Sequence, residues 1–408
     1  MREVAFVLCL VACGAPTAPE DAGSDAGAPD DAAAPDAGAS PCDAVRVPPR
    51  TVEADTSWPC GRWTLDGPVT VRAGATLTLE PGSTIEAGDE DARVVVERDG
   101  RLIAEGTPAR PIVIRGADGW DGVHLRGAAR INVGACFEDP RPDTPECELP
   151  GWRERQDPRG AYGGDDDTSD CGVLRYVRVI GAPLTFSGCG SDTLVSHVRV
   201  DDAPGDGVTV RGGVVPLGHL LVVRPEGRGL VVDEGYRGDV QLLVVDHAGD
   251  DALRIGSRAD RPEAPPRTDA RLWNVTLLGD EDGRPLWIGD GAFAAVRNLV
   301  AVDFGEGPRF EVEDEAWPGS VSLAHALLVR VAEPGSERDE EWLDDPERAI
   351  HTEPDPELEG YAPGRSLPEG EEPSFGPFTP ADFGNRRAVF LGAVPFAGDD
   401  WTRELGPP

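Results

Sequence analysis

The sequence predicts an all-β fold, a single right-handed parallel β-helix that follows a disordered N-terminal tether. Such a fold is a solenoid, and two observations indicate it. First, one phrase recurs through residues 174–329: a residue that is polar or aromatic in all cases but one, followed by apolar residues. It begins at Tyr176, His197, His219, Leu242, Asn274, Asn298 and His325. The first four starts lie roughly 21 to 23 residues apart, a period typical of solenoids in which each repeat is one coil. Second, the chain has 51 Gly and 39 Pro spread along it, which indicates many turns between short strands.

Shorter β segments fall at compatible places between these phrases. They are residues 207–210, 229–232, 252–255 and 285–288, and each is rich in β-branched or other apolar residues and bounded by Gly, Asp or Pro. Two or three such strands per coil of about 22 residues can stack as parallel sheets around a narrow apolar core. The Pro-rich stretch from Ser257 to Asp269 explains the longer step before Asn274 as a loop inserted between coils.

Composition divides the chain into five regions. They are a signal peptide (1–12), a lipidated disordered tether rich in Ala, Asp, Pro and Gly (13–41), the β-helix (42–332), an acidic Pro-rich loop region (333–379) and a C-terminal segment that packs on the β-helix (380–408). The tether has no aromatic residue and no apolar periodicity, so it cannot bury enough surface to offset its ordering entropy.

The N-terminus carries the strongest localisation signal. An apolar run too short to cross a bilayer as a helix ends in Leu10-Val11-Ala12-Cys13, which suits a cleaved signal. This ending resembles a bacterial lipobox, so we expect cleavage before Cys13, a lipid on its thiol and attachment to the membrane. Gly14 follows where inner-membrane retention would need Asp, which implies, by resemblance, an outer-membrane lipoprotein on the cell surface or the periplasmic face.

Six cysteines remain for the exported domain, and an even number in an oxidising compartment indicates disulfides. They are Cys42, Cys60, Cys136, Cys147, Cys171 and Cys189. Six cysteines allow 15 connectivities. Nearest-neighbour pairing is favoured here, and no C-x-x-C pair suggests zinc.

The net charge of the chain limits the classes of partner that it can bind. A formal net charge of −37 arises from 75 acidic residues against 38 basic ones, all of them Arg. A field of this sign repels nucleic acid and anionic headgroups. We therefore expect no nucleic-acid partner; a divalent cation, a basic protein or a glycan fits better, and the chain is expected to be a monomer.

Several phrases resemble bacterial surface proteins with a pectate-lyase-like right-handed β-helix. These phrases are residues 107–115, 119–127 with Ile131-Asn132, 163–167 before 174–178, and 399–402. The resemblance covers most of residues 60–402 and implies the fold. It says little about activity, because this architecture hosts lyases, hydrolases, adhesins and inert proteins alike.

One acidic turn is a candidate cation site. Asp165, Asp166, Asp167 and Asp170 lie close together near Cys171. Crowded carboxylates repel one another unless a hard cation neutralises them, and calcium takes six to eight oxygen ligands from such loops. The alternative is a solvated acidic turn, and no EF-hand spacing is present.

A second candidate would carry chemistry. Asp250 and Asp251, with Arg254 nearby, follow Asp246-His247, and paired carboxylates protonate leaving groups and activate water in the glycoside hydrolases of this fold. The Gly-His-Gly turn and the Arg-Ile-Lys phrase of those hydrolases are absent. A Gly-Asp-Asp turn without catalysis is the alternative.

The polar residues that open the recurring phrases form a third feature, and we expect each of them to open an equivalent strand. A regular solenoid places them near one line, where three histidines invite a metal interpretation. Stacked turn residues that satisfy backbone are the structural interpretation, which is favoured. Nine Trp, among them Trp120, Trp152, Trp273 and Trp287, are candidates for sugar-stacking platforms, but the interpretation of most as core or loop anchors is favoured.

Taken together, these features favour a surface-displayed, non-catalytic β-helix with a binding, adhesion or envelope structural role, stabilised by calcium if the acidic turn binds it. The alternative is a polysaccharide lyase or glycoside hydrolase acting on an extracellular glycan.

Overall fold

The computed structural model describes residues 41–89, 91–116, 120–133, 155–157, 160–311, 320–380 and 383–406. The leader, Cys13 and the tether up to residue 40 lie outside these residues, as do Cys136 and Cys147. No helix among the described residues is long and apolar enough to cross a membrane.

Two large parallel sheets and one small hairpin make up the strands of the described chain. Sheet A contains β1 (Val45–Arg46), β3 (Thr56–Trp58), β4 (Arg62–Leu65), β6 (Thr76–Leu79), β7 (Thr84–Ala87), β9 (Arg101–Glu105), β10 (Ile112–Gly116), β14 (Gly172–Ile180), β16 (Leu194–Asp201), β18 (Leu217–Val223), β20 (Asp239–Asp246), β22 (Asp269–Leu278), β24 (Phe293–Phe304), β26 (Val321–Val331) and β27 (Ile350–His351). Sheet B contains β2 (Thr51–Val52), β5 (Pro68–Val71), β8 (Arg93–Val96), β11 (Val123–Arg126), β15 (Leu184–Ser187), β17 (Val208–Arg211), β19 (Leu230–Asp233), β21 (Asp251–Ile255), β23 (Arg284–Ile288) and β25 (Arg309–Phe310). The hairpin joins β12 (Arg155–Asp157) to β13 (Gly160–Tyr162).

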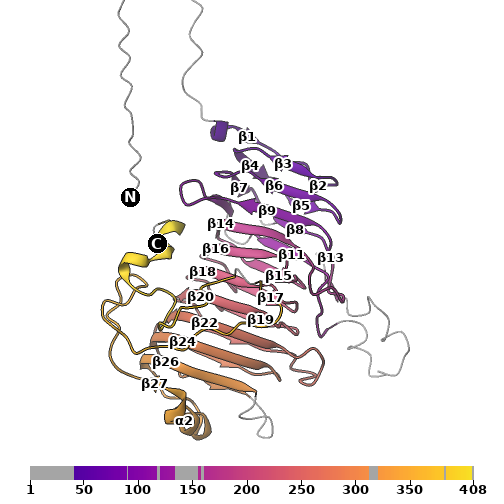
Figure 1. Ribbon diagram of the computed structural model, residues 1–408. Helices are drawn as coiled ribbons and strands as arrows, with labels where there is room; N and C mark the ends of the chain where they lie inside the picture. The colour runs from indigo at the N-terminus through magenta and orange to yellow at the C-terminus, as the bar shows by residue number, and fades with distance from the viewer. Residues whose placement is uncertain are drawn as a thin grey trace, which may run out of the picture. The chain divides into compact units, whose positions relative to one another are not determined.

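The chain alternates between the sheets, so that each coil adds one strand to sheet B and one long or two short strands to sheet A. Figure 1 shows the strands stacked from β1 at one end to β27 at the other. Pairing within both sheets is parallel throughout, as between β14 and β16 or between β15 and β17. The predicted all-β parallel β-helix is confirmed.

One residue per coil bends the long strands of sheet A. In the early coils β9 and β10 are separate strands, and β14 pairs with β9 through its first half and with β10 through its second half. Tyr176, between the two halves, has a φ of +48°. The same left-handed conformation occurs at every later phrase start: His197, His219, Leu242, Asn274, Asn298 and His325.

This conformation explains why the phrases begin as they do. Asn and His enter the left-handed region more readily than most residues, whereas β-branched residues resist it. The expectation that these residues open their strands was wrong: β14 begins four residues before Tyr176 and continues to Ile180, because a single left-handed residue replaces the whole turn.

The core consists of inward-facing columns that run along the coils. Val177, Val198, Leu220, Leu243, Val275, Leu299 and Ala326 form one such column, paired in register. All seven are buried. Burying one such aliphatic side chain stabilises the fold by roughly 1.5–3 kcal/mol, and identical registers let each coil template the next.

Both ends of the solenoid are covered. At the C-terminal end α2 (Glu337–Leu343) packs Trp342 against Phe310, with ring centroids 5.1 Å apart. Arg338 donates to the Phe310 carbonyl at 2.6 Å, and Asp339 accepts from the Phe310 amide at 3.4 Å. These side chains satisfy the outer edge of β25, the last strand of sheet B, which would otherwise be open to pairing.

The N-terminal end and the coil that contains β14 and β15 each carry a disulfide. Cys42, in the 3-10 helix η1 (Pro41–Asp43), pairs with Cys60, and Cys171 pairs with Cys189. Trp58 and Trp63 stack at 4.6 Å behind the first pair. These two pairings are the nearest-neighbour ones favoured by the sequence.

Residues 333–379, expected as a loop region, also contain α2, the 3-10 helix η3 (Pro346–Arg348) and β27, which extends sheet A. Beyond them lies a segment that we call the C-terminal strap, residues 355–380 and 383–406. It includes the 3-10 helices η4 (Ala397–Asp399) and η5 (Trp401–Leu405). The strap runs back over sheet A, and η5 contacts β14, β16 and β18 (Figure 1).

Candidate functional site

The acidic turn at residues 165–170 is held by arginines and by its own backbone. Asp167 is buried and accepts hydrogen bonds from Arg130 (Nε, 2.9 Å) and Arg237 (Nη2, 2.8 Å). Although burial acts to raise the pKa of Asp167, the hydrogen bonds from Arg130 and Arg237 hold that pKa below its ordinary value. Asp167 thus joins the loop after β11 to the turn after β19.

The other three carboxylates have different surroundings. Asp170 pairs with Arg101 at 2.6 Å, Asp166 accepts from the amide and hydroxyl of Thr168, and Asp165 is exposed. Within the described part of the chain, no three His, Cys, Asp or Glu side chains are placed to share a metal ion. The present arrangement does not fit a calcium centre, since an ion would have to displace arginines from Asp167 and Asp170. Calcium binding stays a prediction.

The carboxylate pair at the start of β21 is turned apart. Neighbouring residues along extended chain point to opposite sides, and Asp250 is exposed whereas Asp251 is 1% exposed. Both Asp251 oxygens are engaged, one by Arg254 at 3.1 Å and the other by Arg284 at 2.7 Å. Burial, and next the charge of Asp250, raise the pKa of Asp251 above its ordinary value, against the two arginines.

Arg254 itself is held by an aromatic ring. Its guanidinium lies 3.6 Å from the centroid of the Trp287 ring, on the next strand of sheet B. Trp287 is buried, as are Trp120 and Trp273. This cation–π contact fixes Arg254 beside Asp251, so the sequence-predicted trio is one structural cluster with Trp287 and Arg284.

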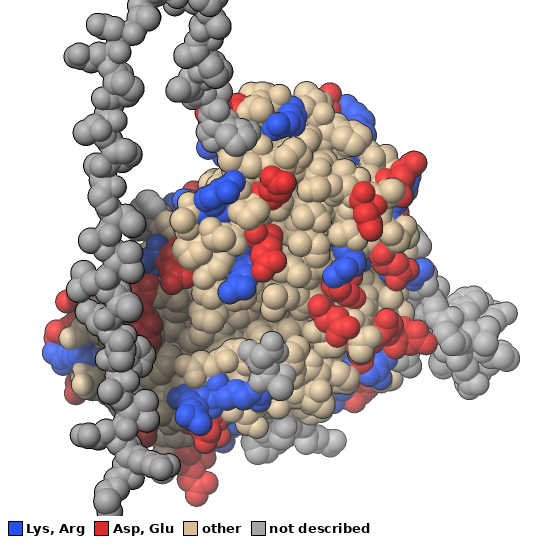
Figure 2. Space-filling view, turned by 45° about the horizontal axis from the view of Figure 1, so that its top comes forward, with Lys and Arg blue, Asp and Glu red and all other residues tan. Residues whose placement is uncertain are grey.

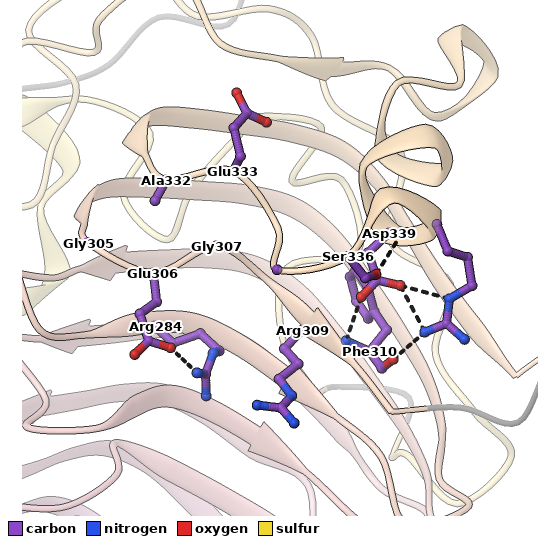
Figure 3. A pocket seen from close by; sticks show the side chains of 12 residues that line it. Arg284, Gly305, Glu306, Gly307, Arg309, Phe310, Ala332, Glu333, Ser336 and Asp339 are labelled. Atoms are coloured by element: carbon purple, nitrogen blue, oxygen red, sulfur yellow. Dashed lines mark hydrogen bonds and ion pairs between the residues drawn. The ribbon is translucent and has the colours of Figure 1, made fainter.

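A cleft of about 530 Å³ adjoins this cluster at the C-terminal end of the solenoid. Figure 3 shows Arg284 and Glu306 pointing toward each other across its wall. At the start of α2, Arg338 donates to Asp339 at 2.9 Å. Arg309, which also lines the cleft, pairs with Glu311. The basic side chains of the cleft are therefore already matched by carboxylates.

Two further clefts, each about 540 Å³, flank the C-terminal strap and share Leu278 and Gly360. Between them Tyr361 donates its hydroxyl to Asp246 at 2.7 Å, and His247 bonds the other oxygen of Asp246 through Nδ1. Burial and the charge of Asp246 raise the pKa of Tyr361. No pattern in the sequence predicted a role for Tyr361, which lies 115 residues from its partner.

The polar column of sheet A forms an aromatic stack at its first three positions. The rings of Tyr176 and His197 are 4.6 Å apart, and those of His197 and His219 are 4.1 Å apart and nearly parallel. Trp401 of the strap meets His219 edge-on at 5.2 Å. Face-to-face imidazoles cannot direct lone pairs at one ion, so this geometry supports the structural interpretation. Burial, with the charges of His197 and Arg175, lowers the pKa of His219 to about 3.

Charge on the surface is distributed in pairs. Figure 2 shows acidic and basic side chains interleaved over the visible face. Several arginines bind an acidic residue one coil away: Arg115 with Glu86, Arg178 with Asp201, Arg224 with Asp202, Arg228 with Asp206, and Arg330 with Asp303. These ion pairs link neighbouring coils.

A family model described as a pectate-lyase-like beta helix domain matches residues 51–332. The chain belongs to this family. The match ends at the last long strand of the solenoid, so α2 and the strap of this beta helix protein lie outside it. No curated protein and no solved structure matches the chain.

Asp167→Asn should lower the free energy of unfolding by about 3 kcal/mol, because it leaves two arginines facing a neutral amide in a buried position. The matched control is Asp165→Asn, an exposed site at which we expect a change within about 0.5 kcal/mol. Urea unfolding with EGTA and with calcium would measure both. A calcium-dependent stabilisation lost in both variants would instead establish the ion site.

His219→Asn should reduce the loss of unfolding free energy that the protein shows as the pH falls. A histidine whose folded pKa lies below its unfolded value gives stability that is present above pH 6.5 and lost as the pH falls toward 3. Wild type should therefore lose about 2.5 kcal/mol more than the variant between pH 7.5 and 4.5. Asn is the residue already present at positions 274 and 298 of the column, so the backbone tolerates it. Denaturant titrations at each pH would measure the free energy of unfolding. An equal loss of that free energy in the two proteins between pH 7.5 and 4.5 would contradict the burial of His219.

Proposed function

We propose that this protein is an exported, lipid-anchored β-helix that binds a partner at the cell surface without converting it. The observation that carries the proposal is the state of Asp251. A general acid must reach its substrate, whereas Asp251 is enclosed and both its oxygens are held by arginines. Asp250, the exposed member, has no second accessible carboxylate beside it in the trio named above.

The covering of sheet A supports the same proposal. The strap buries side chains against the outer surface of the long strands, among them Leu391, Ala393 and Trp401. An extended substrate cannot lie on that part of the sheet while the strap is in place. The described tryptophans support it as well, because Trp120, Trp273 and Trp287 are buried and offer no open ring for a sugar.

The anchor follows from Cys13 and the sequence before it. A lipidated Cys13, followed by the tether up to residue 41, would hold the β-helix outside the cytoplasm, at the outer membrane. Two disulfides in the folded domain agree with an oxidising compartment. A neutral glycan or a basic protein surface is the partner that the net charge of −37 favours.

A polysaccharide lyase or glycoside hydrolase is the second candidate. The observation that favours it is the raised pKa of Asp251 beside ionisable Asp250, since carboxylates in contrasting environments often divide the acid and base roles. Arg254 and Arg284 would have to move for either oxygen of Asp251 to reach a glycosidic bond.

A soluble chain from Ser40 onward, which is one compact unit, would separate the two candidates. We expect it to bind members of a panel of neutral and uronic-acid glycans or of envelope proteins, without forming unsaturated products in the ultraviolet or new reducing ends. Asp250→Asn should bind like wild type. Product formation that Asp250→Asn or Asp251→Asn abolishes would overturn the binding proposal in favour of the enzyme.

Cys13→Ser tests the anchor. In a bacterial host the wild-type chain should incorporate labelled palmitate and sediment with membranes, whereas the variant should do neither and should enter the soluble fraction. Cys9→Ser is the matched control, because Cys9 lies in the leader and should not matter. Unchanged sedimentation of Cys13→Ser would exclude lipidation at this residue.

A further inference from the structure

Side chains on the outer face of sheet A form hydrogen bonds with the main chain of the strap. Gln241, fully buried, donates to the Asn385 carbonyl at 2.8 Å and accepts from the Asn385 amide at 2.6 Å. Asn298 makes the same reciprocal pair with Glu371, at 2.8 and 2.7 Å. Each side-chain amide therefore stands in for one residue of a neighbouring strand.

Other buried polar side chains extend this contact. Asn274 donates to the carbonyls of Ala388 and Phe390 at 3.0 and 2.7 Å. Thr276 accepts from the Ala393 amide at 2.8 Å, and Asp239 accepts from the Gly376 amide at the same distance. We call Asp239, Gln241, Asn274, Thr276 and Asn298 the backbone-binding row. They come from three neighbouring strands, β20, β22 and β24.

Apolar contacts add selectivity to this main-chain recognition. Ala393, Val394 and Trp401 pack on Leu221 and Val244, and Leu391 packs on Val300 and its neighbours. The face thus recognises an extended segment with small apolar residues at set positions. This is how an extended peptide is bound at a protein surface: main-chain hydrogen bonds give affinity and side-chain pockets give specificity.

The strap is a peptide segment that binds the face and is joined covalently to the same solenoid. It lies outside the residues matched by the family model, and Gly364, Arg365 and Ser366 are exposed. Residues 363–370, if extended, span roughly 26 Å. Among the described residues neither sheet contains a residue after His351, so the portion from Arg365 onward can leave its own face without separating any strand.

We propose that the outer face of sheet A is a peptide-docking surface, and that the strap of a second copy of this chain docks on it by exchange. Every copy carries the same strap and the same row, so reciprocal exchange remakes all the contacts and closes a two-fold dimer. Copies gathered on one membrane would favour it through their high local concentration. The inference goes beyond the proposed function, since it requires neither a glycan nor the lipid.

The experiment uses the soluble chain from Ser40 with a protease recognition sequence inserted between Gly364 and Arg365, cut after folding. The uncut protein should keep the wild-type unfolding midpoint. After cutting, the fragment should co-elute with the solenoid, and a fluorescent synthetic peptide of residues 365–408 should exchange into its place and saturate, read by anisotropy.

Thr276→Val and Thr209→Val are the matched pair of variants. Both are isosteric changes in strands, but only Thr276 accepts a bond from the strap, whereas Thr209 lies on sheet B. Leaving the buried Ala393 amide without an acceptor should weaken peptide binding roughly tenfold to hundredfold. Thr209→Val should bind within about twofold of the parent.

The second copy is tested with uncut protein. Unlabelled and ¹⁵N-labelled chains, mixed at high concentration and then diluted, should yield mixed-label dimers in native mass spectrometry. A fragment that dissociates with no rebinding of the peptide, or equal peptide affinity for the two variants, would overturn the docking surface. Peptide exchange without mixed-label dimers would overturn the second copy as its occupant.

Discussion

Each coil from β14 onward turns on a single residue in the left-handed conformation. One such residue takes the place of a loop, so two short strands become one bent strand. The coil therefore needs fewer residues to complete its turn. The left-handed conformation also fixes which residue types can occupy the position, because most side chains pay a backbone penalty there. Leu242 is the exception among the polar and aromatic members, and its side chain is buried in the cluster that includes Trp401.

Most side chains of the same column also make contacts on the surface of sheet A. At Tyr176, His197 and His219 the side chains stack on one another and receive Trp401, whereas Asn274 and Asn298 turn their amides to the strap main chain. A residue chosen for its backbone freedom thus also carries a polar or aromatic group at the surface of the sheet. The strap completes the fold because it removes these polar groups from water and its main chain supplies their hydrogen-bond partners.

Charge is organised on the scale of one coil. A net charge of −37 would make a compact solenoid repel itself, but many of its arginines meet a carboxylate of the neighbouring coil or of the loops. Arg, with its planar fork, suits these two-point contacts better than Lys, and the chain uses no Lys. The acidic turn that resembles a cation site follows the same pattern, since Asp167 forms ion pairs with Arg130 and Arg237.

The sequence by itself determined what repeats locally. The 21-to-23-residue spacing of Tyr176, His197, His219 and Leu242 predicted the coil, because a solenoid contacts mainly its neighbours and its period is written along the chain. Close spacing likewise favoured the pairs Cys42–Cys60 and Cys171–Cys189. The leader and Cys13 set an expectation about export that needs no folded structure.

Only the tertiary structure decided which partners each candidate side chain meets. Asp251 forms an ion pair with Arg284 from the next coil, 33 residues away, and Asp246 accepts a hydrogen bond from Tyr361, 115 residues away. The first separation is one coil lengthened by an inserted loop, and the repeat does not show which side chains of neighbouring coils meet. The second follows no period, because the strap returns over the sheet by a path that the repeat does not encode. The left-handed bend was equally hidden, since a strand and a bent strand share the same apolar pattern. Local periodicity therefore specified the coil, while burial and long-range charge pairing specified the sites.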